Sequence, residues 1–135
     1  MQAIFTVDGH GMMPCKANDS DAAFDLFSPR MIMLYRNVVT NVFIGVRVDM
    51  EGCYGLICPR SGLATKGVTI VNSPGVIDEG YKGEIGIILT TFQNTVIQQG
   101  QAIAQIIFMP TLTVATNGKY ANTKRGAKGF GSSDA

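Results

Sequence analysis

The stretch N-S-P-G-V-I-D-E-G-Y-K-G-E, residues 72–84, joins two apolar runs near the middle of the chain. The runs, residues 68–71 and 85–89, are rich in β-branched side chains, so we predict that they form a β-hairpin with a wide tip. Glycines and a proline mark the bends of that tip, where backbone N–H and C=O groups can approach a flat ligand. Asp78 and Tyr81 are its candidate functional side chains, and an ordinary surface turn is the competing interpretation.

Outward from this hairpin, the rest of the sequence also has the pattern of short strands. The runs are β-branched, aromatic or alternating, and turn residues separate them. They cover residues 4–7, 21–29, 31–39, 42–48, 53–58, 94–97 and 102–109. No stretch of ten or more residues has a helical period, and only residues 59–67 suggest a single helical turn. We therefore predict an all-β fold.

Length and composition indicate one domain that assembles with copies of itself. A chain of 135 residues is long enough for a single compact core. Apolar residues make up 46% of the sequence and charged residues only 16%. That balance indicates that other subunits cover part of the apolar surface, so we expect a homo-oligomer.

The charge and the cysteines argue against several classes of protein. A formal net charge of +1 provides no broad positive surface, so we expect neither nucleic acid nor a membrane as partner. Cys15, Cys53, Cys58 and His10 lack metal-ligand spacing, and we interpret the cysteines as small buried residues or incidental thiols. No signal peptide or membrane span is recognisable. We predict a soluble intracellular protein of the cytoplasm or nucleus.

Three polar residues suggest an anion site. Ser61 lies where a helix N-cap would be, beside Arg60, so the pair could bind a phosphate. A capped turn with a solvated arginine is the competing interpretation. Gln105 lies inside an apolar strand, where its amide needs either a backbone partner or a ligand phosphate. Asp25 lies on one face of its predicted strand, and a solvated strand residue is again the alternative.

The composition changes near residue 116, and we place a boundary there. Residues 1–115 would form the all-β core, and residues 116–135 a glycine-rich arm with too few apolar residues to hold itself folded. Arg125 and Ser132 could meet phosphates, backbone N–H groups between the glycines could add donors, and Phe130 could stack on a base. A solubilising tail is the alternative.

Five segments together resemble, in order and spacing, the five motifs of the trimeric dUTPase family. They are residues 22–26, 59–64, 72–84, 100–105 and 125–133, so the resemblance runs from about Asp21 to the last residue. The family implies a jelly-roll-like β-barrel subunit. It also implies a homotrimer around a threefold axis, with an active site at each junction between subunits.

The same resemblance implies hydrolysis of dUTP to dUMP and pyrophosphate, which limits uracil in DNA and supplies dUMP for dTMP synthesis. Asp78 would orient and activate a water for attack on the α-phosphorus. Asn72 and the backbone of Gly75 and Val76 would read uracil. Tyr81 would pack under the deoxyribose.

The remaining motifs would bind the triphosphate and its metal. Mg²⁺ is expected on the phosphates, with Asp25 reaching it through a water. The arm would close over the site, with Phe130 on uracil. The residues implied for phosphate binding are Arg60, Ser61, Gly62 and Gln105 in the core and Arg125, Gly131 and Ser132 in the arm.

The chain departs from the usual motifs at several positions, and none of them removes a proposed catalytic group. They are Ala23, Phe24, Gln101-Ala102, Ala127-Lys128 and Ser133. Two other functions remain as alternatives. A dCTP deaminase shares the fold, but its catalytic glutamate lies where this chain has Ile88. The other alternative is a catalytically silent dUTPase-like module that senses nucleotides or binds a protein.

Overall fold

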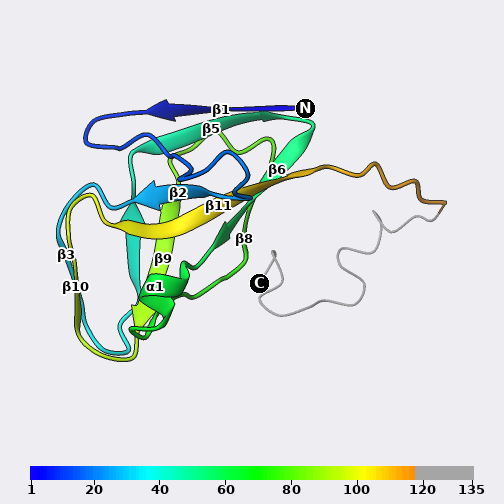
Figure 1. Cartoon of the computed structure of the whole chain (residues 1–135). Helices are drawn as coiled ribbons and strands as arrows, with labels where there is room; N and C mark the ends of the chain where they lie inside the picture. The colour runs from blue at the N-terminus through cyan, green and yellow to red at the C-terminus, as the bar shows by residue number, and fades with distance from the viewer. Residues whose placement is uncertain (118–135) are drawn as a thin grey trace.

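The computed structural model describes residues 1–117, and it consists almost wholly of short β-strands (Figure 1). Within residues 1–117 the single helix is α1 (Ser61–Ala64). The strands are β1 (Gln2–Val7), β2 (Phe24–Phe27), β3 (Ile32–Leu34), β4 (Thr40–Phe43), β5 (Val46–Glu51), β6 (Cys53–Cys58), β7 (Val68–Ile70), β8 (Gly75–Ile77), β9 (Gly86–Thr91), β10 (Thr95–Ile97) and β11 (Ala102–Pro110). The all-β prediction is confirmed, including its one helical turn.

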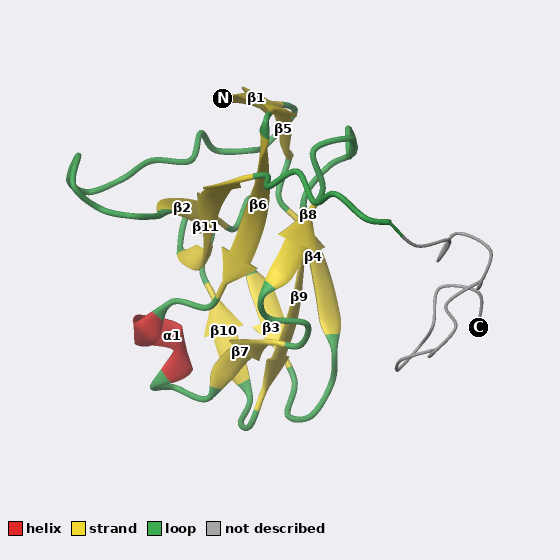
Figure 2. Ribbon diagram, turned by 90° about the vertical axis from the view of Figure 1, so that its right-hand side faces the viewer, coloured by secondary structure: helices red, strands yellow, loops and turns green. Residues whose placement is uncertain are grey.

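The strands form four antiparallel sheets. The largest has the order β2-β11-β6-β8, and a second has the order β4-β9-β7. Two-stranded ribbons, β1-β5 and β3-β10, complete the fold. The β1-β5 ribbon and helix α1 lie at opposite ends of the molecule in both views (Figures 1 and 2). Together the sheets make a jelly-roll-like fold around one core.

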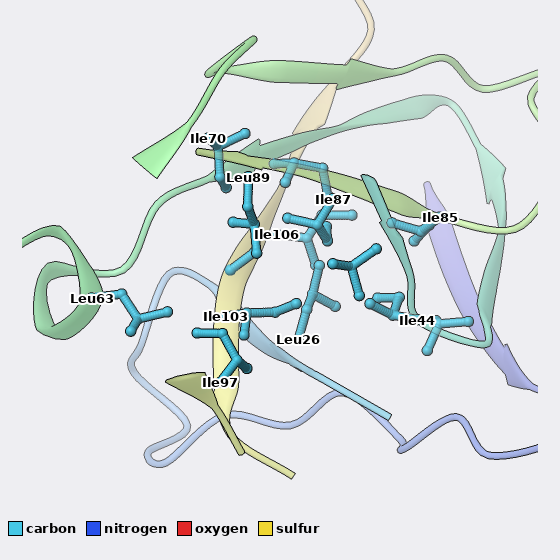
Figure 3. Close-up of a cluster of buried hydrophobic side chains, with 14 of the residues drawn as sticks. Leu26, Ile44, Leu63, Ile70, Ile85, Ile87, Leu89, Ile97, Ile103 and Ile106 are labelled. Carbon is cyan, nitrogen blue, oxygen red and sulfur yellow. The ribbon is translucent and has the colours of Figure 1, made fainter. Parts of the chain in front are cut away.

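The inward-facing side chains of these sheets form that single core. Strands β5 and β9 show the expected alternation, with every second residue buried. Ile87 and Leu89 of β9 are fully buried and pack in the same cluster as Leu26 of β2 and Ile106 of β11 (Figure 3). The core therefore connects the two large sheets.

The predicted hairpin exists, but its tip contains an additional strand. Strands β7 and β9 pair in antiparallel register, with Val68 opposite Thr91 and Ile70 opposite Leu89. Between them the chain leaves this sheet as β8 and pairs with β6 of the other large sheet, where Ile77 is opposite Gly55. The connection thus joins both sheets and places Asp78 directly after β8.

The strand boundaries differ from the prediction where turns interrupt apolar runs. The run 42–48 is divided between β4 and β5 at Gly45, which has a φ of +71°. A Cβ at Gly45 would lie 2.8 Å from the carbonyl oxygen of Asp8, so this position has no room for a side chain. The run 31–39 shortens to β3 because Val38 N–H donates to the Tyr35 carbonyl and closes a turn.

Two sequence expectations can be compared with the fold directly. Cys53 is buried, Cys58 is partly buried and Cys15 is exposed, and all three are free thiols. In the part of the chain that the structure describes, no helix is long and apolar enough to cross a membrane.

Replacing Ile87 by alanine should strongly destabilise the fold, because its side chain is fully buried at the centre of β9. We expect the free energy of unfolding to fall by about 2–5 kcal/mol, as for other large-to-small core substitutions. Urea unfolding followed by circular dichroism measures this change. Ile4→Ala is the matched control, since Ile4 is 51% exposed, and an equal loss in both variants would contradict the assignment of the core.

Candidate functional site

Two of the predicted phosphate-binding residues, Arg60 and Gln105, converge with Asp25 at one edge of the β2-β11-β6-β8 sheet. Gln105 of β11 lies opposite Asp25 of β2 on one side and opposite Cys58 of β6 on the other. Arg60 follows β6 by two residues, and its Nε donates to Asp25 Oδ1 at 2.9 Å. The Nε2 of Gln105 donates to the Pro59 carbonyl at 2.8 Å, which accounts for the amide in an apolar strand.

These residues line a pocket of about 440 Å³. Asp25 is one-quarter exposed and Arg60 about one-third exposed, so both side chains are accessible from the pocket. The other lining residues are Ala17, Asp21, Ala22, Ala23 and Ile107. Arg60 pairs with Asp25 through Nε, so the two terminal nitrogens of its guanidinium remain available. Two parallel N–H donors of this kind are suited to bind an oxyanion. We call this the Arg60 pocket.

The N-cap prediction for Ser61 is wrong. Arg60 occupies the N-cap position with extended backbone angles, and no side chain caps the helix. Ser61 is already the first helical residue, so its hydroxyl does not have the position of a cap. Neither Ser61 nor Gly62 lines the Arg60 pocket, and both are exposed beside it.

The tip residues form a compact, anchored loop. Tyr81 N–H donates to the Asp78 carbonyl at 3.0 Å, and Tyr81 Oη donates to the Glu84 carbonyl at 2.7 Å. The Glu84 carboxylate in turn accepts the Gly45 N–H at 2.7 Å. At the start of the loop, Glu79 accepts the Gly52 N–H at 2.9 Å. Contacts on both sides therefore hold Asp78 in place although it is exposed.

A second pocket, of about 360 Å³, brings Asp78 and Tyr81 together with Val76 and Ile77. Its other lining residues come from the outer face of the β4-β9 ladder, and sequence reasoning proposed no role in binding for any of them. They are Asn41, Phe43, Gly86 and Ile88. We call this the Asp78 pocket. The alternation of Asn41 and Phe43 with buried Val42 and Ile44 was a signal that they face outward, but not that they face the tip.

Asn72 and Gly75 lie beside the Asp78 pocket but do not line it. The Asn72 amide packs on Gly75, where an added Cβ would lie 3.3 Å from Asn72 Nδ2. Gly75 is buried at the start of β8, opposite Ile57. The Asn72 side chain therefore packs on the first residue of β8, and its role in reading uracil stays a prediction.

The Arg60 pocket and the Asp78 pocket have no lining residue in common. One chain thus presents the candidate site in two separate parts. Among residues 1–117, no group of three or more His, Cys, Asp or Glu side chains is placed to hold a metal ion. The predicted arm residues Arg125, Phe130, Gly131 and Ser132 lie outside the described residues, and the boundary at residue 116 stays a prediction.

Comparisons with known proteins agree on one family. The model of the dUTPase family matches residues 10–134. A deoxyuridine 5'-triphosphate nucleotidohydrolase from Clostridium novyi is 40% identical over 127 residues, which is 90% of this chain and 89% of that protein. A protein of the same name from Mycobacterium sp. is 41% identical and covers 97% of this chain and 93% of its own length.

Solved structures show the same fold. The EIAV dUTPase superposes with a TM-score of 0.75 at 27% identity, covering 87% of this chain and 96% of that one. A mutant dUTPase from phage phi11 of S. aureus superposes with a TM-score of 0.79 at 22% identity, covering 88% of this chain and 97% of that one. The latter structure is described as showing the coordination of a structural Mg(II) ion.

The Arg60–Asp25 pair should contribute only modestly to stability, because both side chains are partly exposed to solvent. A double-mutant cycle with Arg60→Ala and Asp25→Ala should give a coupling energy of about 0.5–1 kcal/mol that falls as salt is added. Urea unfolding of the four proteins at low and high ionic strength measures it. A coupling well above this range, insensitive to salt, would mean that the pair is a structural element and not an accessible anion site.

Proposed function

The chain belongs to the dUTPase family, and we propose that it hydrolyses dUTP to dUMP and pyrophosphate, with Asp78 activating the attacking water. This proposal rests mainly on the match of the family model to residues 10–134. The matched residues include Asp78, which lines one pocket together with Tyr81. This activity limits uracil in DNA and supplies dUMP for dTMP synthesis. We also propose an intracellular location, in the cytoplasm or nucleus, where DNA precursors are used.

Asp78 is suited to general-base work. Its carboxylate is exposed at the end of β8, and the turn that holds it is closed by the hydrogen bond from Tyr81 N–H. A carboxylate held at a fixed place can accept a proton from a water aimed at the α-phosphorus. Tyr81 would pack under the deoxyribose, while Asn72 and the backbone of Gly75 and Val76 would read uracil.

The phosphate chain would lie in an Arg60 pocket. Arg60 provides a fork of donors, and Gln105 lies beside it on β11. Ser61 and Gly62, exposed at the start of α1, would add contacts from the pocket rim. Arg125, Gly131 and Ser132 of the arm would reach the terminal phosphates, and Phe130 would cover the base.

The donor set of the Arg60 pocket fits a Mg²⁺ ion carried by the substrate. Asp25 already accepts a hydrogen bond from Arg60 and would meet the ion through a water, since Mg²⁺ keeps several of its waters. When bound, Mg²⁺ neutralises charge on the phosphates. The residues of the chain then orient the phosphates and the attacking water.

We propose that three copies assemble and that each active site combines an Asp78 pocket with an Arg60 pocket of another copy. The separation of the two pockets in one chain supports this arrangement. Exposed apolar side chains support it too, because large apolar surfaces of this kind are usually covered by partners. They include Val76 (58% exposed), Leu112 (79%) and Val114 (71%).

Ile88 argues against the deaminase alternative. This side chain lines the Asp78 pocket, where a deaminase would need a carboxylate for acid–base catalysis. Isoleucine can neither accept nor donate a proton.

Substituting Asp78 by asparagine should abolish most turnover and leave substrate binding intact, because the amide keeps the shape but not the basicity of the carboxylate. We expect kcat for dUTP to fall by about 10²- to 10⁴-fold. Pyrophosphate release with Mg²⁺ from dUTP, dCTP, dTTP and UTP, on wild type and variant in parallel, measures this. Wild-type protein that binds dUTP but releases no pyrophosphate would instead support the silent-module alternative.

Mixed assemblies test the composite site. Asp78→Asn and Arg60→Ala proteins should each be nearly inactive, but refolding them together should restore about a quarter of the wild-type activity, since random assortment pairs the intact halves at that frequency. Each variant refolded alone is the control. If the mixture stays inactive while forming mixed oligomers, each site lies within one chain.

A further inference from the structure

We propose that Asn41 of β4 is a further substrate-reading residue, whose carboxamide hydrogen-bonds to the pyrimidine base in the Asp78 pocket. The inference rests on the proposed function, because it assumes that this pocket receives the nucleoside of dUTP. Asn41 lies more than thirty residues before the tip, with β5, β6, α1 and β7 in between, and only the fold brings it there.

The register of β4 and β9 directs Asn41 toward the pocket. Val42 and Ile44 are fully buried, so the alternate residues Asn41 and Phe43 lie on the outer face. Asn41 is directly opposite Ile88, and Phe43 is directly opposite Gly86. Figure 2 shows the two strands side by side. The outer face of this ladder is therefore one wall of the Asp78 pocket.

Gly86 allows the Asn41 amide to lie close to the backbone of β9. A Cβ added at Gly86 would be 2.6 Å from Asn41 Oδ1 and 3.1 Å from Phe43 Cε1. The φ of Gly86 is not in the left-handed region, so a turn does not account for the glycine. Its missing side chain instead leaves space that the amide and the aromatic ring occupy.

Asn41 also has side-chain hydrogen-bonding groups that the other side chains of the pocket do not offer. Val76, Ile77, Phe43 and Ile88 are apolar, and the Tyr81 hydroxyl already donates to the Glu84 carbonyl. Asp78 can only accept when ionised. The Asn41 side chain is exposed, and among residues 1–117 it makes no hydrogen bond that would occupy its amide.

A neutral carboxamide both donates and accepts, so it can pair with a neighbouring donor and acceptor at once. Uracil offers this combination on its edge, where the ring N3–H lies beside the C4 carbonyl. The amide oxygen would accept from N3–H, and the amide nitrogen would donate to the carbonyl. The deoxyribose 3'-hydroxyl is a competing target, which the experiment below separates from the base.

The test compares Asn41→Ala and Asn41→Leu with wild type in steady-state pyrophosphate release from dUTP. Losing the hydrogen bonds should raise KM about threefold to tenfold and leave kcat within about twofold, since a neutral pair contributes modestly. The leucine variant keeps the side-chain volume, so it should show the same loss. Thr40→Ala is the matched control on the same strand and should behave as wild type.

Two further measurements decide whether the contact is to the base. With 2',3'-dideoxyuridine triphosphate, which lacks the 3'-hydroxyl, the increase in KM caused by Asn41→Ala should persist. Gly86→Ala should also raise KM, and by less in the Asn41→Ala background than in wild type, because the added methyl acts by displacing the amide.

The outcomes separate this inference from the proposed function. A wild-type protein that releases no pyrophosphate from dUTP would reject the proposed function itself. An active wild type with unchanged KM in both Asn41 variants would overturn only the role of Asn41. Loss of the effect with the dideoxy substrate would overturn the base contact, because it would assign the amide to the sugar.

Discussion

The pairing of β8 with β6 is the constraint on which the candidate site depends. Strands β7 and β9 belong to one sheet, but the segment between them crosses to the other sheet, where Gly55, Leu56 and Ile57 hold it in register. A long connection without this pairing would be free to move. With it, Asp78 is placed by two sheets that share one core, and the carboxylate has a defined position without being buried.

The same arrangement underlies our proposal that one chain is incomplete as an enzyme. The carboxylate and the tyrosine lie on the β8 side, while Arg60, Asp25 and Gln105 lie on the opposite edge of the same sheet, around β11 and β2. Catalysis of phosphoryl transfer needs positioning groups and a water-activating group around one reacting atom. The proposed trimer with composite sites would satisfy this need, and its apolar contacts would cover side chains that are exposed in the single chain.

Two glycines, Gly45 and Gly86, let neighbouring polar groups come close to the backbone near the Asp78 pocket. Gly45 leaves room for the Asp8 carbonyl, and its N–H holds the Glu84 carboxylate at the end of the tip. Gly86 leaves room for the Asn41 amide. In both places an added Cβ would overlap with neighbouring atoms, and at Gly86 one of those atoms belongs to the amide that lines the Asp78 pocket. Gly45 has in addition a positive φ, whereas at Gly86 it is the missing side chain that matters.

The local sequence pattern by itself determined the all-β class, most of the strands and the β7–β9 pairing. It also pointed to Asp78, Tyr81, Arg60 and Gln105 as candidate functional residues. Both were possible because alternation, turn residues and motif spacing are properties of residues close together in the sequence. Only the tertiary structure decided the rest. It moved the N-cap from Ser61 to Arg60, paired β8 with β6, divided the candidate residues between two pockets and brought Asn41 to Asp78. These features arise from packing and register between segments distant in sequence, and no local pattern encodes which outer face meets which loop.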